Sequence, residues 1–432
     1  MRDLLRPTAL DDADARVAVE LARDPDRADA WYCRGIIANR RRDHANAIAA
    51  LRRAIALRPD AALAWLALGT AFSRGSEWSE ATDAYGRAIE HEPSWADAHL
   101  NLGLARKQLG DNEGALRAFH AAWVRDPMLT EAARQCVAAI ADDVTHDPDT
   151  ADFAERDEPA PLHPSFTVVV CSIDAAKQTR AVALYRRLFA DFPHEIVAVT
   201  NPRSLAEAYN QAAQASRADI VLMSHDDVDV IAPDFASRIA RLLATRADAL
   251  GVIGATRLDG PAVGWSGHPN LRGWIVHRDG DETGWRLDVL DHRPFADGVE
   301  ILDGVVMAAR RDVLRAVPFD AVTFDGFHLY HLDWSHRVAR AGFRVGVCGE
   351  LIVVHASRGS YGAEWERRAA RFCALHGVGR GEPKPSSFAG ATLNSLRQVR
   401  AFFARLSSLA EGVGDPLAQA LKRLEGQAVF GL

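Results

Sequence analysis

A spacing of 34 residues recurs through the first third of the chain. Trp31 and Trp65 lie 34 residues apart, and His99 continues the step. Small residues at fixed positions of such a period let two helices approach closely, and a larger apolar residue fills the gap between them. A proline then ends the second helix. The period predicts three stacked helical hairpins that bury their apolar faces against one another. The positions that keep this register are Gly35, Gly69, Gly103; Ala47, Ala81, Ala115; Leu51, Tyr85, Phe119; Ala54, Ala88, Ala122; and Pro59, Pro93, Pro127.

This period and residue set resemble the tetratricopeptide repeat. Three repeats and a capping helix at residues 130–141 would fill residues 28–141, and residues 1–27 would hold a leading helix at 10–23. The resemblance implies an all-α superhelix whose concave groove binds a protein partner or a peptide segment. The alternative is a spacer or a dimerisation module.

The bulk composition excludes several classes of protein. With 432 residues, 48% of them hydrophobic, the chain is long enough for two or three domains. A net charge of −7 gives no support to nucleic-acid binding. The five cysteines have no short paired spacing, which argues against a zinc site or a disulfide framework and fits a reducing compartment. We find no apolar run long enough for a transmembrane segment and no signal-peptide core, and we expect a cytoplasmic protein.

The composition of the chain and the order of its predicted elements change after the repeats. Residues 142–164 are acidic and carry four prolines, which predicts a flexible linker. From residue 165 to 378, strands at 166–171, 195–200 and 220–223 alternate with helices at 176–191 and 205–216, and this order predicts a parallel sheet. Neither a GxGxxG turn nor a GxxxxGK[ST] loop occurs in it. Residues 379–432 form a tail with a helix near 395–409, expected to serve docking or homo-oligomer formation.

The stretch from 218 to 233 concentrates acidic side chains at the end of a strand. The apolar run 220–223 reads as a buried strand, and His225, Asp226, Asp227 and Asp229 follow it closely. In open α/β sheets ligands bind at the carboxyl ends of the strands. Clustered carboxylates there fit a divalent cation that also contacts substrate phosphates. The alternative is a solvated acidic loop that caps the next helix.

Six segments in a fixed order resemble a family-two-type glycosyltransferase of the GT-A fold, and within it a prokaryotic glucosyltransferase subfamily. The resemblance implies a multidomain protein in which the repeats precede an α/β, Rossmann-like GT-A domain of the nucleotide-diphospho-sugar transferases. It implies an inverting hexosyltransferase that moves a sugar from a nucleoside-diphosphate sugar, UDP being the expected nucleotide, to a saccharide or protein acceptor. The segments are residues 171–174, 204–210, 224–227, 302–304, 324–330 and 355–357.

The same resemblance assigns nucleotide and metal contacts. Asp174 corresponds to the position that meets the nucleobase, although an Asp there also forms turns. Arg203 and Asn210 would lie near the ribose or diphosphate, unless they are ordinary helix-surface or capping groups. The implied metal ligands are Asp226, Asp227, Asp229 and His355, with Asp226 also beside the nucleotide. An imidazole among carboxylates suits Mn²⁺ better than Mg²⁺.

The acceptor side would hold the catalytic groups. In relatives an acidic pair begins the helix after residues 324–330, and here that pair reads His331 and Asp333. Either residue could take the proton of the acceptor hydroxyl, His331 because the ordinary imidazole pKa lies near working pH. The retained acid favours Asp333, which could instead be a charge at a helix N-terminus. Asp303, before Gly304, would border the transferred sugar.

Three tryptophans could form sugar platforms. Trp265, Trp274 and Trp285 lie in a Gly-rich stretch, 260–298, that is expected to be a long loop between sheet elements. They could equally form the core of that loop.

Two other functions fit parts of the pattern. A non-catalytic nucleotide or sugar-binding scaffold would explain why Ser224 stands where relatives often have Asp and why His331 replaces an acid. A nucleotidyltransferase shares the α/β shape, but residues 171–177 lack the Gly- and Arg-rich first loop it needs.

Overall fold

A computed structural model describes residues 7–147, 163–278, 284–357, 362–381 and 389–412 of the protein. The chain divides into two compact units, Met1–Ala139 and Ile140–Leu432. Most of the predicted linker, residues 148–162, lies outside the described residues. Within the described residues, no helix is long and apolar enough to cross a membrane. All five cysteines are free thiols.

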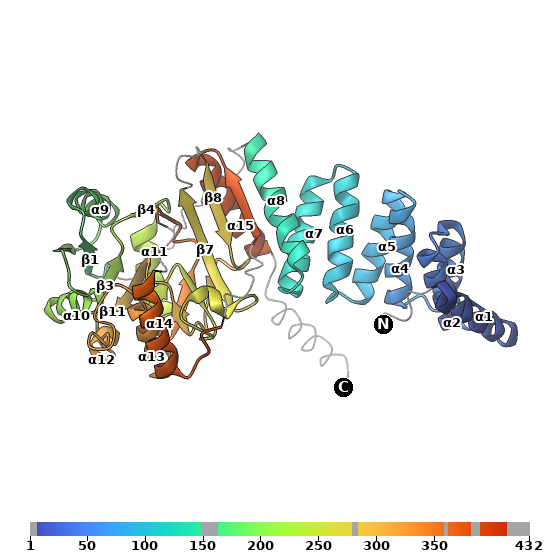
Figure 1. The fold of residues 1–432 in the computed structure, drawn as a ribbon. Helices are drawn as coiled ribbons and strands as arrows, with labels where there is room; N and C mark the ends of the chain where they lie inside the picture. Colours follow the sequence, from blue (N-terminus) through green and yellow to red (C-terminus); the bar gives the residue numbers. More distant parts are fainter. Residues whose placement is uncertain (1–6, 148–162, 279–283, 358–361, 382–388, 413–432) are drawn as a thin grey trace, which may run out of the picture. The chain divides into compact units, whose positions relative to one another are not determined.

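The first unit consists of antiparallel helix pairs that follow one another along the chain (Figure 1). The first helices of the three pairs begin at Ala28, Ala62 and Ala96, which keeps the 34-residue step. The predicted tetratricopeptide-type repeat is therefore confirmed. The helices are α1 (Pro7–Arg23), α2 (Ala28–Arg40), α3 (His44–Leu57), α4 (Ala62–Arg74), α5 (Trp78–His91), α6 (Ala96–Gln108), α7 (Asn112–Arg125) and α8 (Thr130–His146).

Close packing within each pair explains the recurring glycines. A Cβ placed on Gly69 would lie 2.6 Å from the ring of Tyr85, so only glycine lets α4 and α5 approach this far. Gly35 meets Leu51 and Gly103 meets Phe119 in the same way.

The recurring indole has a polar role as well. The Trp65 Nε1 donates to the carbonyl of Pro59 at 2.8 Å, and Trp31 makes the equivalent bond to Pro25. His99 takes this position in the third repeat, with its Nε2 3.1 Å from the carbonyl of Pro93. An imidazole keeps the hydrogen-bonding nitrogen of the indole, which explains why His99 continues the series.

The second unit contains a mixed sheet in the order β2-β1-β3-β11-β5-β12-β9. Strands β1, β2 and β3 are parallel, as predicted, and β11 runs antiparallel to β3. The strands are β1 (Phe166–Ser172), β2 (His194–Thr200), β3 (Ile220–Ser224), β5 (Ala249–Gly251), β9 (Phe295–Ala296), β11 (Val306–Arg310) and β12 (Val345–Cys348). The helices of this unit are α9 (Ala175–Leu188), α10 (Leu205–Ala215), α11 (Phe235–Thr245), α12 (Arg311–Ala316), α13 (Tyr330–Arg340), α14 (Ala363–His376) and α15 (Leu396–Gly412).

A second sheet lies in the same unit, and the sequence did not predict it. Residues 260–298, expected as a loop, include two of its strands, so that expectation was wrong for the described part of the stretch. Its path is β10-β6-β7-β13-β4, with β8 paired to β7 and β14 to β8. The strands are β4 (Val228–Val230), β6 (Ile253–Ala255), β7 (Leu271–Arg278), β8 (Trp285–Val289), β10 (Ile301–Leu302), β13 (Val353–His355) and β14 (Ala389–Leu393).

The chain passes from one sheet to the other directly after β3. Strand β4 pairs antiparallel with β13, and β13 pairs in parallel with β7. The turn between β3 and β4 thereby brings the acidic stretch of the sequence to the C-terminal end of β13, where His355 lies.

Candidate active site

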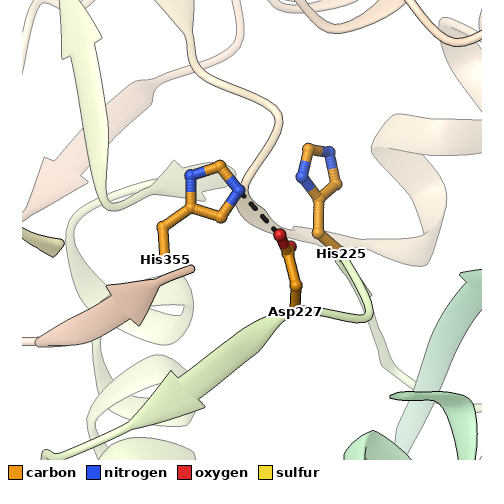
Figure 2. A group of neighbouring side chains, drawn as sticks. All are labelled: His225, Asp227 and His355. Carbon is orange, nitrogen blue, oxygen red and sulfur yellow. Dashed lines mark ion pairs between the residues drawn. The ribbon is translucent and has the colours of Figure 1, made fainter. Parts of the chain in front are cut away.

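Two histidines and an aspartate form a cluster where the two sheets meet. Figure 2 shows His225 and Asp227 on the turn after β3, with His355 on β13 opposite them. One potential ligand atom from each of the three side chains lies within 4.8 Å of the others. Two imidazoles and a carboxylate at this spacing can hold one divalent transition-metal ion. Among the described residues, His225, Asp227 and His355 are the side chains whose spacing would allow them to hold a metal ion together.

The carboxylate of Asp227 is held in its charged form. The Nε2 of His355 lies 3.4 Å from Asp227 Oδ1, and both side chains are buried. Burial raises the pKa of Asp227, but the hydrogen bond and charge of His355, with smaller contributions from Ser357 and His225, outweigh this and leave the pKa below its usual range. Asp227 is thus an anion at neutral pH, as a metal ligand must be.

His225 is the ligand candidate that the sequence analysis did not assign. Its backbone N–H donates to Val305 at 3.1 Å, and its Nε2 lies 3.4 Å from the Tyr330 hydroxyl. Burial, followed by the neighbouring His355, lowers the pKa of His225, so the ring stays neutral and can donate a lone pair. The signal in the sequence was its position, one residue after a buried strand and two before Asp227.

The cluster opens on a cavity of about 460 Å³. His225 and His355 contribute to its wall together with residues from β6, β7, the start of α13 and α14. The predicted residues Asp303 and His331 also line it, whereas Asp333 is not among its lining residues. The volume lies in the range of small-molecule sites.

His331 faces this cavity at the start of α13. Gly304 makes room for it, since a Cβ on Gly304 would lie 2.9 Å from His331 Nδ1. Burial lowers the pKa of His331 to about 4, although the charge of Asp303 acts in the opposite direction. One oxygen of Asp303 accepts the backbone N–H of Val305 at 3.1 Å, which orients the carboxylate at the cavity wall.

Asp333, which the sequence favours as the base, does not line this cavity. Its side chain is 2% exposed, and Oδ2 pairs with Arg337 at 2.7 Å while Oδ1 lies 3.2 Å from His376. Arg337 lies one turn further along α13, and His376 is the last residue of α14. The structure therefore places Asp333 in an ion-pair network that joins α13 to α14, and leaves His331 as the member of the pair that reaches the cavity.

A family model described as "Glycosyltransferase like family" matches residues 167–374, which include the cluster and every lining residue of the cavity. These residues form a glycosyltransferase-like domain. A search of curated proteins found no match.

Solved structures resemble part of the chain. MamA is 25% identical, covers 32% of this chain and 80% of its own, and has a TM-score of 0.31. The Arabidopsis OM64 TPR domain is 20% identical over 26% of this chain and 93% of its own, with a TM-score of 0.26. The first TPR domain of the human RPAP3 protein is 18% identical over 27% of this chain and 91% of its own, also with a TM-score of 0.26.

The other predicted metal ligands of the glycosyltransferase-like domain are not in the cluster. Asp226 accepts a hydrogen bond from Ser172 at the end of β1. Asp229 lies on β4 opposite Val354, and its side chain is exposed. Asp227 lies on the turn before β4 (Val228–Val230), so the alternation of that strand does not place it on the face of Asp229. Of the four predicted metal ligands, Asp227 and His355 therefore lie in the cluster, together with His225, and Asp226 and Asp229 lie outside it.

The predicted nucleotide contacts are dispersed. Asp174 caps α9, accepting the backbone N–H groups of Ala176 and Lys177, and is exposed. These bonds, first that of Lys177, lower the pKa of Asp174 despite a smaller opposing effect of burial. Capping does not occupy the whole carboxylate, so a nucleobase contact stays a prediction. Arg203 is exposed between β2 and α10.

Asn210, predicted to lie near the nucleotide, makes two hydrogen bonds to the backbone of Phe319. Its side-chain N–H donates to the carbonyl of Phe319 at 2.8 Å, and its oxygen accepts the Phe319 N–H at 2.9 Å. The two bonds fix the segment after α12 against α10. The ordinary structural alternative is therefore the one that the hydrogen bonds favour.

The three tryptophans expected to offer sugar platforms do not line the cavity. Trp274 is fully buried and stacks on Phe403 of α15. Trp265 donates to the carbonyl of Arg380 at 2.8 Å. Apart from histidines, the aromatic residues of the wall are Trp365 and Phe327, neither of which was predicted from the sequence.

Proposed function

We propose that the protein is a metal-dependent glycosyltransferase that moves a hexose from a nucleoside-diphosphate sugar, a UDP-sugar in the first instance, to a saccharide or protein acceptor. The observation that carries the proposal is the cluster of His225, Asp227 and His355, which opens on the 460 Å³ cavity inside the glycosyltransferase-like domain. Ligand positions beside a pocket at the end of a sheet are what such a reaction requires.

The donor set favours Mn²⁺ over Mg²⁺. Imidazole nitrogen suits transition metals, whereas Mg²⁺ prefers oxygen ligands alone. When bound by these three residues, the ion would stabilise the negative charge of the departing nucleoside diphosphate.

His331 is the proposed proton acceptor. In an inverting transfer the acceptor oxygen forms a bond to the anomeric carbon while the bond from that carbon to the diphosphate breaks, and the acceptor proton must leave. A neutral imidazole at the cavity wall can take it. The pKa of about 4 leaves His331 unprotonated at neutral pH, and Asp303 on the same wall would orient the acceptor hydroxyl.

The repeats would hold the acceptor or a partner protein. Support comes from the regular stack of helix pairs, an architecture that presents an extended concave surface. The five free thiols fit a reducing compartment such as the cytoplasm. A homo-oligomer is compatible with this arrangement.

A non-catalytic scaffold is the alternative, and two observations favour it. Ser224, in the place of an acid, is buried and receives a hydrogen bond from the Tyr185 hydroxyl. Asp333, the acid retained from the pair of relatives, forms ion pairs with Arg337 and His376. Turnover of a nucleotide sugar separates the two functions.

The test is the release of nucleoside diphosphate from a panel of nucleotide sugars in the presence of Mn²⁺. Asp227→Asn should reduce release by more than about 100-fold, because even partners of metal ligands cost 10- to 100-fold when changed. Asp229→Asn is the matched control two residues away, exposed and outside the cluster, and should retain activity. Equal activity of Asp227→Asn and the parent would refute the metal assignment.

A further inference from the structure

Strand β7 forms one wall of the cavity with alternate residues. Leu271, Ile275 and His277 line it, as expected for side chains separated by even numbers of positions on a strand. The opposite face carries Trp274, stacked against Phe403 of α15 with ring centroids 5.2 Å apart. The wall is therefore backed by packed structure, and its cavity-facing side chains are fixed in direction.

The polarity of this wall changes along the strand. His277 is paired in register with His355, and their ring centroids lie 6.2 Å apart, so this end of the strand adjoins the metal cluster. His277 Nε2 also lies 3.5 Å from Asp288 on β8. The polar end of the wall is thus the end beside His355.

The other end of the wall is aliphatic. Around Gly273, between Leu271 and Ile275, β6 places Ile253 in register and Leu290 donates its N–H to the Gly273 carbonyl at 3.1 Å. The side chains of all four of these aliphatic residues line the cavity. None of those four side chains can form a hydrogen bond, and Asp303, whose backbone N–H donates to the carbonyl of Ile253 at 2.9 Å, lies at the border with the polar part of the cavity.

A ligand made only of sugar does not match such a wall. Hydroxyl groups placed against aliphatic side chains lose their water partners and gain none, which costs free energy for each group. An alkyl or aryl group in the same place gains free energy from the surface it buries. The wall therefore matches a ligand that is polar near His355 and apolar near Leu271.

We propose that the acceptor is a saccharide carrying an apolar aglycone, with the sugar toward His331 and Asp303 and the aglycone over Leu271, Ile275 and their aliphatic neighbours. This inference rests on the proposed function, because the bound saccharide is an acceptor only if the protein is a glycosyltransferase. The apolar group can be an alkyl chain or an aryl ring, which share this chemistry.

Binding of simple glucosides to the full chain tests the proposal. Methyl, butyl and octyl glucosides, each below its micelle concentration, are titrated calorimetrically beside phenyl glucoside. Affinity should rise about fourfold for each methylene that reaches the aliphatic end. A gradient along the alkyl series with weak phenyl binding assigns an alkyl chain, and tight phenyl binding assigns an aryl ring.

Two neighbouring positions on β7 supply a variant and its control. Ile275→Thr makes the aliphatic end more polar and should lower the octyl-to-methyl affinity ratio by about fourfold or more. Val276→Thr is an equivalent change on the opposite face of the same strand, where the side chain is fully buried and outside the cavity lining, and should leave that ratio unchanged. A loss of the ratio in both variants would indicate general disruption of the strand and overturn the assignment.

Two further outcomes separate the inference from the proposed function. If donor is cleaved but methyl, butyl, octyl and phenyl glucosides bind equally, or if a serine-containing peptide is glycosylated and the glucosides are not, the inference is wrong and the glycosyltransferase stands. If no donor is cleaved but the affinity gradient and the effect of Ile275→Thr are present, the apolar site stands and the transferase does not.

Discussion

At the scale of single residues, the site depends on which atoms its histidines face. In the sequence His225 stands next to two aspartates, but its role could not be predicted. A ring at the end of a strand can turn toward several neighbouring residues. In the structure the Tyr330 hydroxyl lies 3.4 Å from His225 Nε2, and Tyr330 itself is 1% exposed. A buried partner of this kind fixes the orientation of a metal-binding imidazole.

Removing that hydroxyl should weaken metal binding without disturbing the fold. We expect Tyr330→Phe to lower the Mn²⁺ affinity by about 10-fold or more, measured by calorimetry or by the paramagnetic resonance of free Mn²⁺. Tyr85→Phe is the control: it removes an equally buried hydroxyl, bonded to Ser73, from the repeat unit. An unchanged Mn²⁺ affinity in Tyr330→Phe would show that Tyr330 does not position His225.

The pH profile reports on His331. Only the neutral imidazole accepts a proton, and with a pKa of about 4 the neutral form dominates at every pH above that value. We expect the rate to be flat from about pH 7 to 5 and to fall as the pH drops through about 4; an imidazole with its ordinary pKa would lose activity near pH 6.5 instead. Circular dichroism at each pH controls for unfolding, and His331→Asn should remove most of the activity. A fall centred near pH 6.5 would contradict this environment for His331.

At the scale of elements, the packing of each helix pair depends on one glycine. Gly69→Ala would place a methyl group 2.6 Å from the ring of Tyr85. Because the displaced ring lies in a tight core, we expect a loss of about 1 to 3 kcal/mol in the free energy of unfolding.

Gly86→Ala is the control for that substitution. It lies on α5, and a Cβ there meets no atom of the described chain within 4 Å. This change should stabilise the protein by up to about 1 kcal/mol through helix propensity. Urea denaturation compares the two variants, and equal effects would show that the Gly69 contact is unimportant.

The elements also differ in how well they could be predicted from the sequence. The repeat helices were predictable because Gly35, Gly69 and Gly103 contact residues only 16 positions further along the chain. A contact this local recurs with the 34-residue period and can therefore be recognised in the sequence. The strands β1 to β3 were predictable as continuous apolar runs. The second sheet was not, since β7 pairs with the distant β13 and its residues alternate between a cavity and α15.

The site was predicted only where position along the chain decides the contact. Asp227 follows the end of one buried strand and His355 lies at the end of another, and the ends of both strands could be predicted from the sequence. The direction of Asp333 was not, because its partner His376 lies on a different helix and a helix position alone says nothing of the neighbour it faces. For the same reason His277 was missed, although it lies beside His355.

At the scale of the whole molecule, the second unit begins earlier than the predicted domain start at residue 165. It includes the end of α8 from Ile140, where Asp143 lies 3.6 Å from Arg405 on α15. Ile140 and Val144 are fully buried. We therefore expect a chain that starts at Thr130 to be more stable than one that starts at Pro164.

The difference should be about 1.5 to 3 kcal/mol for each of the two buried side chains. Both truncated chains retain the complete glycosyltransferase-like domain, and thermal unfolding compares them directly. Equal midpoints would show that the end of α8 is not part of that folding unit.

The position of His355 in the cluster with His225 and Asp227 has a consequence during synthesis. Asp227 and His355 are separated by 128 positions of the chain, whereas each repeat is complete within 34. At ordinary rates of translation those 128 residues take on the order of ten seconds to emerge. The repeats, whose contacts are local, can fold and receive a partner during that interval. Under the proposed function, a nascent chain would meet a partner of the repeats before the three cluster residues are all available to bind a metal ion, so recruitment would precede activity on the ribosome.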